Sequence, residues 1–251
     1  MNFLYDRSRY PSSWDFLQWL VNAEIANTLA GAKSGELKIV FKGEHRNDGL
    51  ARSLADRQAI FENVMRPAIK LMAAEEVPYE EGMELAGVQY TPKYAVDHAI
   101  HGGGDIPYFR VPLESAREVQ AYLKGRRPVV ITLREAEHYP TRNSNLEAWT
   151  EFARTCGEDV IFVRDTSNAD VPLQGFETCP RASKELWFRL ALYHSARCNL
   201  FVANGPYNLT IYSPSPWLCF GQLHPEIPEW RAGTAEFWEN AVGVPEDGQF
   251  P

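Results

Sequence analysis

Two short apolar runs on either side of a helical pattern open this chain, and they constrain its fold more than any other feature. Residues 2–5 (NFLY) and 37–41 (LKIVF) are the apolar runs, and residues 14–29 repeat apolar side chains at helical spacing. Gly31 then stands where a helix commonly ends. Strands joined by a single helix pair in parallel, because the helix returns the chain to the same end of the sheet. The opening therefore predicts a parallel sheet with helices on its faces.

The same order of elements returns in the second half of the chain. The pattern predicts strands at 128–133, 160–163 and 199–203 and helices at 146–155 and 182–197. The fold class we expect is α/β, built from two Rossmann-like βαβ layers that face a cleft. Open α/β sheets bind their ligands at the carboxyl ends of their strands, so a cleft there is the expected place for a site.

The middle of the chain is harder to assign. We expect a long helix at 52–74 that is interrupted at Pro67, a loop-rich stretch at 85–107, and another helix at 115–125. The pattern then resets near Lys124–Arg127. This predicts an N-terminal α/β domain at 1–125 and a C-terminal α/β domain at 126–251.

Composition excludes several classes of protein. The 251 residues carry a formal net charge of -8 and no basic run, which argues against a nucleic-acid partner. No stretch approaches the roughly 20 apolar residues of a spanning helix, and the start lacks a signal-peptide pattern, so we expect a cytoplasmic protein with no transmembrane segment. The four cysteines are widely spaced, which predicts free thiols and no metal site.

The densest group of chemically capable residues follows the strand at 128–133. Arg134 emerges where that strand ends, and Arg142 follows after a polar loop. Asn143, Ser144 and Asn145 then lead into the helix at 146–155. Two guanidinium groups beside the first turn of a helix suit an anion, through charge-assisted hydrogen bonds and unpaired backbone amides. The alternative is that the arginines pair with nearby glutamates at 135, 137 or 147.

A second candidate region is the turn after the strand at 199–203. Gly205 permits close approach of a ligand to the backbone, and Pro206 suits the first position of a helix. The amides that follow suit a diphosphate. The predicted contributors are Asn204, Gly205, Pro206, Tyr207 and Asn208.

Acidic residues complete the set of candidates. Asp165 follows the strand at 160–163, where a carboxylate can accept a hydrogen bond from a ribose hydroxyl or from an N–H group of a nucleobase. The alternative is an ion pair with Arg164 or Arg181. Asp6 and Glu44 each follow a strand of the first half, and they are the candidates for a general base that deprotonates a hydroxyl.

Two familiar motifs are discounted. His101-Gly-Gly-Gly104 resembles the oxyanion loop of an esterase, but the chain contains no G-x-S-x-G nucleophile motif. It also lacks G-x-G-x-x-G after the first strand and G-x-x-x-x-G-K-[ST] anywhere, which removes the main support for dinucleotide enzymes and P-loop kinases. A small hydrolase that uses the His101 loop remains a third alternative.

The run ITLREAEHYPTRNSN resembles the strand-plus-arginine motif of the fucosyltransferase-like glycosyltransferases of the GT-B architecture. Arg134 stands at the family's arginine position, while Thr132 replaces the family's histidine. The helix at 146–155, the strand VIFVRD and the segment FVANGPYNL are similar in order to the rest of that family's donor half. The family's serine- and threonine-rich turn is Asn204-Gly205-Pro206 here. The resemblance covers residues 128–215.

This resemblance implies a compact or truncated GT-B fold, with an acceptor-side domain at 1–125 and a nucleotide-sugar donor domain at 126–251. Arg134 and Arg142 would hold the donor diphosphate and Asp165 the nucleoside, with no metal and no cofactor beyond the nucleotide-sugar substrate. It implies a donor such as GDP-fucose, a glycan or other hydroxyl acceptor, and a role in polysaccharide biosynthesis. The alternative is a non-catalytic nucleotide-sugar or glycan binding module of a larger glycan-assembly protein.

Overall fold

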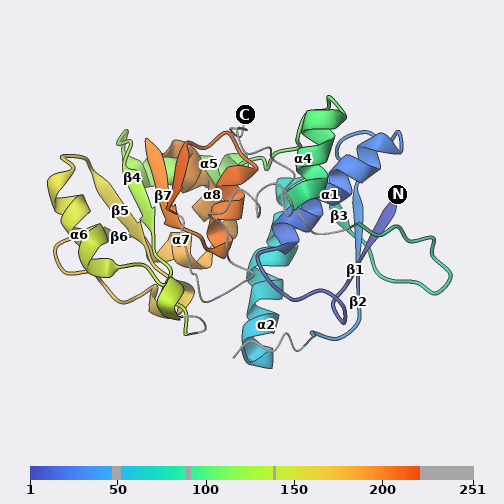
Figure 1. Cartoon of the computed structure of the whole chain (residues 1–251), viewed down its shortest axis with the longest axis horizontal. Helices are drawn as coiled ribbons and strands as arrows, with labels where there is room; N and C mark the ends of the chain where they lie inside the picture. Colours follow the sequence, from blue (N-terminus) through green and yellow to red (C-terminus); the bar gives the residue numbers. More distant parts are fainter. Residues whose placement is uncertain (47–51, 89–91, 138–139, 221–251) are drawn as a thin grey trace. The chain divides into compact units, whose positions relative to one another are not determined.

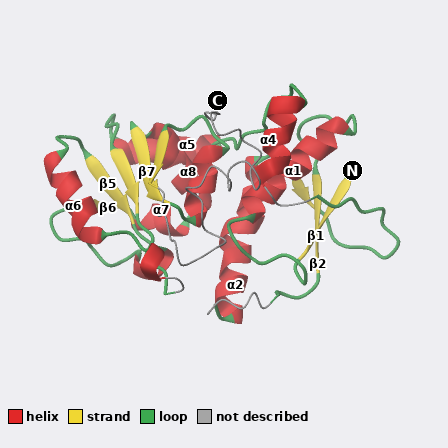
Figure 2. Cartoon of the chain, viewed as in Figure 1, coloured by secondary structure: helices red, strands yellow, loops and turns green. Residues whose placement is uncertain are grey.

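The computed structural model describes residues 1–46, 52–88, 92–137 and 140–220 (Figure 1). These fall into two compact units. Among the described residues, the first unit comprises 1–46, 54–88 and 92–108, and the second comprises 52–53 and 109–220, apart from 138–139. Both are α/β with parallel sheets, and strands alternate with helices in each (Figure 2). No helix among the described residues is long and apolar enough to span a bilayer.

The first unit contains a small parallel sheet of order β1-β2-β3. A bridge between Phe3 and Ala86 extends it on the other side of β1. Its elements are β1 (Asn2–Asp6), α1 (Phe16–Leu29), β2 (Lys38–Lys42), α2 (Leu54–Ile60), a π-helical turn (Phe61–Met65), α3 (Arg66–Leu71), β3 (Glu75–Glu76) and α4 (Pro92–His101).

Aromatic rings connect the elements of the first unit. Tyr5 on β1 makes edge contacts with Phe16 and Trp19 on α1, with ring centroids 5.0 and 5.1 Å apart. Phe41 on β2 continues the cluster to Phe61, 4.8 Å away. Edge-to-face pairs of this kind add stabilisation beyond the area that they bury. They hold the carboxyl ends of β1 and β2 against α1 and the π-helical turn.

The second unit contains a five-stranded parallel sheet of order β6-β5-β4-β7-β8. Helix α6 lies on one side of this sheet, and α5, α7 and α8 lie on the other (Figure 1). The elements are α5 (Leu113–Leu123), β4 (Val129–Thr132), α6 (Leu146–Thr155), β5 (Val160–Val163), β6 (Glu177–Thr178), α7 (Pro180–Lys184), α8 (Leu186–Ser195), β7 (Cys198–Val202), α9 (Asn208–Ile211) and β8 (Trp217–Phe220).

The burial of the central strands of this sheet explains why the sequence pattern predicts them. All four residues of β4 are buried, as are three of the four in β5, so both strands read as continuous apolar runs. Val129, Ile131 and Leu133 project into one core, where Trp149 and Ala153 of α6 cover them. The predicted strand at 160–163 and helix at 146–155 are confirmed to the residue.

Other expectations need correction. The loop-rich stretch 85–107 also contains a helix that the sequence pattern does not predict, because α4 occupies ten of its residues. Pro67 does not break the helix, because the preceding π-helical turn carries the chain into α3, with the Arg66 amide bonded to the Phe61 carbonyl. The helix predicted at 182–197 is two helices, since Glu185 between α7 and α8 has extended backbone.

The boundary between the units lies at residues 108–109, ahead of α5. The sequence pattern predicts a domain boundary after α5, at 125–126. Helix α5 packs on α8, so it lies with the second sheet. All four cysteines are free, and only Cys179 is fully buried.

Candidate functional site

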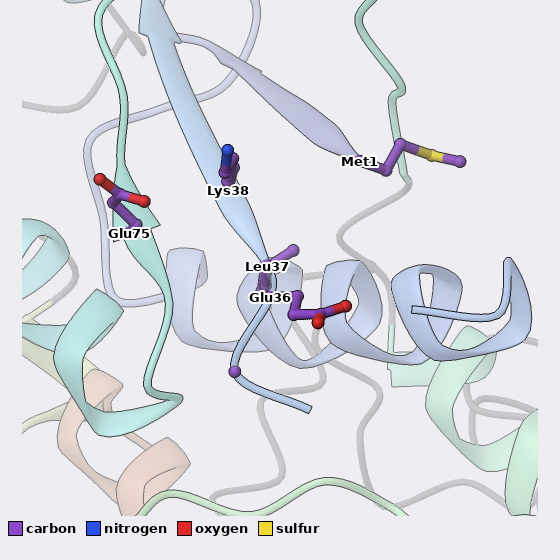
Figure 3. Close-up of a pocket in the computed structure, with 6 residues that line it drawn as sticks. Met1, Glu36, Leu37, Lys38 and Glu75 are labelled. Carbon is purple, nitrogen blue, oxygen red and sulfur yellow. The ribbon is translucent and has the colours of Figure 1, made fainter. Parts of the chain in front are cut away.

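A shallow pocket of about 430 Å³ lies at the amino edge of the sheet in the first unit. Met1, Glu36, Leu37, Lys38 and Glu75 line it (Figure 3). These residues precede or begin β1, β2 and β3, whereas parallel α/β sheets bind ligands at the opposite, carboxyl edge. This pocket is therefore not the candidate site.

The strand order of the second unit marks a more informative place. The chain runs outward from β4 to β5 and β6, then returns to place β7 on the other side of β4. The order therefore reverses between β4 and β7, and such a switch point is where open α/β sheets form their binding crevice. Three predicted site residues each lie two positions past a central strand: Arg134 after β4, Asp165 after β5 and Asn204 after β7. The topology brings them to one edge of the sheet.

Arg134 is buried, with 5% of its surface exposed. Its Nη1 donates to Oδ1 of Asn143, and its backbone amide donates to Ser144 Oγ at 2.9 Å. Asn143 also bonds both the amide and the carbonyl of Ala136, at 3.0 and 2.9 Å. The loop after β4 is thus folded back on itself, and it fixes the direction of the Arg134 guanidinium.

The electrostatic environment of Arg134 favours an anion. Burial lowers the pKa of Arg134 from its usual value, and the nearby Asp165 carboxylate raises it. An arginine stays charged despite such a shift. A buried cation gains from any further negative charge brought near it, because the surroundings solvate it poorly.

Arg142 spans the switch point itself. It ends a short 3-10 turn, Pro140–Arg142, and its Nη2 donates to the carbonyl oxygen of Ala203 at 3.1 Å. Ala203 directly follows β7. The loop after β4 is therefore joined to the end of β7 by an arginine side chain, which places a second positive charge at the switch point.

Asp165 accepts hydrogen bonds from the backbone on both of its carboxylate oxygens. Its Oδ2 accepts from the amide of Glu135 at 3.1 Å, and its Oδ1 accepts from the amide of Thr166 at 3.0 Å. It therefore links the chain after β4 to the chain after β5. Its partners are backbone amides and not the side chains of Arg164 or Arg181.

Glu135 and Arg164 form a buried ion pair that the sequence did not reveal. Their side chains are 17% and 9% exposed, and Glu135 accepts from both Nε and Nη2 of Arg164. Glu135 also accepts from the amide of Asp165 at 3.2 Å. Both residues lie just past neighbouring parallel strands, and pairing of Thr132 with Val163 brings them together. The alternative in which Glu135 neutralises Arg134 is not what the geometry shows.

The turn after β7 is tightly organised. Asn204 is 9% exposed, and its Oδ1 accepts from the amide of Tyr207 at 3.3 Å. The amide of Asn208 bonds back to the carbonyls of Gly205 and Pro206. Two of the amides proposed for a diphosphate therefore already have partners within the turn. The Nδ2 of Asn204 is buried without a hydrogen-bond partner in the described residues, so this side chain retains donor capacity.

Asn145 caps α6, as predicted. Its side chain accepts from the amide of Ala148 at 3.1 Å. We expect Asn145→Ala to lower the free energy of unfolding by about 1 kcal/mol, because the cap hydrogen bond is lost. Urea denaturation measures this loss. Asn145→Ser keeps a capping oxygen and should stay close to the wild-type chain, so equal losses in the two variants would contradict the capping role.

Thr132, which occupies the place of the histidine in the fucosyltransferase-like motif, points away from the site. It is buried, and its Oγ1 lies 2.8 Å from the hydroxyl of Tyr193 on α8. The side chain therefore joins β4 to the helix that covers it. His138 and Tyr139 of the same motif lie outside the described residues.

The two predicted general bases lie at the carboxyl edge of the sheet in the first unit. Asp6 ends β1, and its Oδ1 accepts from the amide and the hydroxyl of Ser8, at 3.0 and 2.6 Å. That carboxylate holds the turn after β1. Glu44 follows β2 and is exposed. Their catalytic assignment stays a prediction.

Comparison with protein-family models gave no match, and comparison with curated proteins gave none either. Two solved structures resemble the chain. One is TibC, an iron-containing dodecameric glycosyltransferase from enterotoxigenic E. coli H10407, with 13% identity and a TM-score of 0.48. That match covers 87% of this chain and 57% of TibC, so this chain spans little more than half of that protein's length.

The second is a glycosyl transferase family 9 protein from Veillonella parvula DSM 2008, with 11% identity and a TM-score of 0.49. The match covers 98% of this chain and 93% of that one. At these identities and scores, neither structure assigns a role to any residue of this chain.

Proposed function

We propose that this chain is a glycosyltransferase that moves a sugar from a nucleoside-diphosphate donor to a hydroxyl acceptor. The observation that carries the proposal is the buried Arg134 guanidinium at the end of the central strand, beside the β4–β7 switch point. A diphosphate placed there would meet Arg134 and Arg142. A guanidinium presents a planar fork of donors that matches phosphate oxygens.

The same arrangement suits the chemistry of glycosyl transfer without a metal ion. When the bond between the anomeric carbon and the diphosphate breaks, the bond's electron pair goes to the departing phosphate oxygen. The acceptor hydroxyl forms the new bond to carbon and gives its proton to a general base. Fixed positive groups near the departing phosphate stabilise the charge that develops on it. Arg134 and Arg142 would supply that stabilisation, with Asn204 as a further donor.

Nucleoside recognition is the less constrained part of the proposal. Asp165 lies at the carboxyl end of β5, where a carboxylate would meet a ribose. Both of its oxygens already accept backbone amides, and a carboxylate has lone pairs for further donors. GDP-fucose is the first donor to test. A glycan acceptor and Glu44 or Asp6 as the base complete the proposal.

A thermal-shift screen with GDP-, UDP-, ADP- and CMP-sugars tests donor binding. A ligand at 100 times its dissociation constant adds about 2.7 kcal/mol to the stability of the folded state. For a unit of this size we expect a rise of roughly 10 °C in the melting temperature with the right nucleotide class. Absence of any shift would contradict the proposal. Binding without transfer or hydrolysis would favour a non-catalytic binding module instead.

A further inference from the structure

A cluster of cations lies at the carboxyl edge of the sheet in the first unit. Arg7 follows β1 and His45 follows β2, and the amide of Arg46 donates to the carbonyl of Arg7 at 2.8 Å across the two strand ends. The Nη1 of Arg7 lies 3.2 Å from Nε2 of His45. On the other side of the ring, Nδ1 of His45 lies 2.7 Å from Oγ of Ser12. The three side chains form one hydrogen-bonded chain.

The geometry fixes the protonation state of the His45 ring. A guanidinium is a donor only, so Nε2 of His45 must accept from Arg7. The ring proton is then on Nδ1, where it donates to Ser12. His45 is therefore neutral in this arrangement, and it stands beside a permanent positive charge.

The pKa of His45 is lowered overall, although its neighbours act in both directions. Burial is the largest influence, and it lowers the pKa of His45. The charges of Arg7 and Arg57 lower it further, whereas a hydrogen bond that the Gln58 side chain accepts and the charge of Glu62 raise it. An anion beside Nε2 would reverse this balance, because a protonated ring could then donate to it.

Arg7 differs from its neighbour Arg66 in its counter-ions. Both guanidinium groups stack on the ring of Phe61, at 4.7 and 4.8 Å from its centroid. Arg66 is neutralised by Glu62 and Glu76, and it hydrogen-bonds both carboxylates. Among the described residues no carboxylate lies within ion-pair distance of Arg7, although the charges of Glu62 and Glu76 raise its pKa, and its Nε is buried without a hydrogen-bond partner.

We infer that Arg7, His45 and Ser12 form a binding site for a tetrahedral oxyanion of the phosphate or sulfate ester class. The oxyanion would insert between Arg7 and a protonated His45, and it would replace one bond to a neutral ring with charge-assisted bonds from two cations. The site lies where parallel α/β sheets bind ligands. This inference does not rest on the proposed function, because it concerns binding in the first unit alone.

Inorganic sulfate is the first probe, because it keeps a charge of about -2 between roughly pH 5 and pH 8, so any change in affinity arises in the protein. Calorimetric titration of the full chain at constant ionic strength should show tighter binding as the pH falls. Arg7→Ala should weaken binding by about tenfold or more. Arg9→Ala removes the same charge from an exposed side chain at the same edge and should have little effect. Equal affinities of Arg7→Ala and Arg9→Ala for sulfate would contradict a binding site at Arg7.

The His45 ring gives a second readout that does not depend on global affinity. Its NMR signal, assigned with His45→Gln, should titrate at a higher pH when sulfate or inorganic phosphate is present. His45→Gln should also remove the pH dependence of sulfate binding. If Arg7→Ala does not fold, Arg7→Lys keeps the charge but loses the fork, and it should bind more weakly than the wild-type chain. If the pKa of His45 does not change when the anion is added, the proposal is wrong.

The lowered pKa of His45 also predicts that the stability of the folded chain depends on pH when no anion is bound. The pKa of His45 is lowered in the folded state, so its stabilising contribution is present above the unfolded value of about 6.5 and is lost as the pH falls through the folded value. Thermal melts of the wild-type chain should therefore lose more stability on acidification than those of His45→Gln. Added sulfate should reduce that difference.

Discussion

Arg134→Ala is expected to lower kcat/KM for the nucleotide-sugar by about 10²–10³-fold, because removal of one fixed donor from a developing oxyanion has a cost of that size. The loss should appear in kcat as well as in donor affinity, since the departing diphosphate carries more negative charge in the transition state than in the bound donor. Steady-state kinetics with the donor found by the thermal-shift screen measures both. Unchanged donor affinity and turnover would contradict the placement of the diphosphate at β4.

The chain offers a matched control for this variant. Arg127 is exposed and precedes β4, so it lies at the amino end of the strand whose carboxyl end carries Arg134. Arg127→Ala removes the same charge from the opposite edge of the sheet and should leave the kinetics unchanged. Arg134→Lys is informative in addition, because it retains a positive charge but loses the planar fork. We expect it to recover only part of the activity.

Loss of Glu135 should have the largest effect on stability. Glu135→Ala would leave the buried Arg164 guanidinium without its carboxylate, and breaking one side of a buried ion pair typically costs about 3–5 kcal/mol. Urea denaturation measures the loss, and hydrogen exchange along β4 and β5 assigns it to the second unit. The exchange protection of β1 and β2 should not change.

Two further variants separate pairing from general disruption. Glu118→Ala breaks an ion pair with Arg181 in the same unit, but both side chains are about 40% exposed. Exposed pairs contribute little, so this variant should lose less than about 1 kcal/mol. Glu135→Leu combined with Arg164→Met removes both charges, and it should be more stable than Glu135→Ala. If Glu118→Ala and Glu135→Ala lose the same free energy of unfolding, the Glu135–Arg164 pair stabilises the chain no more than an exposed ion pair does.

The parts of the fold that were predictable are those that fill the core. The continuous apolar runs of β4 and β5 and the asparagine cap of α6 carry their structure in local sequence. By contrast, the sequence pattern does not predict β3, β6 and β8. The first two are only two residues long, and β8 alternates between partly buried and exposed side chains at the end of the described sheet. Tertiary pairing creates such strands, and local propensity does not reveal them.

The candidate site was predictable only in outline. The position of Arg134 after a buried strand predicted its place at the carboxyl edge of the sheet, because parallel strands end together. The contacts of Asn143 with Ala136 and of Arg142 with Ala203 depend on the path of a loop, which no periodicity encodes. Prediction of the Glu135–Arg164 pair requires the register between β4 and β5. A charged residue next to a strand end is compatible with several partners until that register is known.

The π-helical turn at Phe61–Met65 has a consequence for how the first unit tolerates changes in chain length. A π turn holds one residue more than a turn of α-helix, so deletion of one residue there would leave an ordinary helix running from α2 into α3. Because the wide turn already accommodates the extra residue, the deletion would leave α2 and α3 in nearly the same phase. It would shorten the spacing between Phe61 and Arg66 by one residue and so disturb the stacking of Arg66 on Phe61. A shortened helix here would gain regular hydrogen bonding and lose the present contact between Arg66 and Phe61.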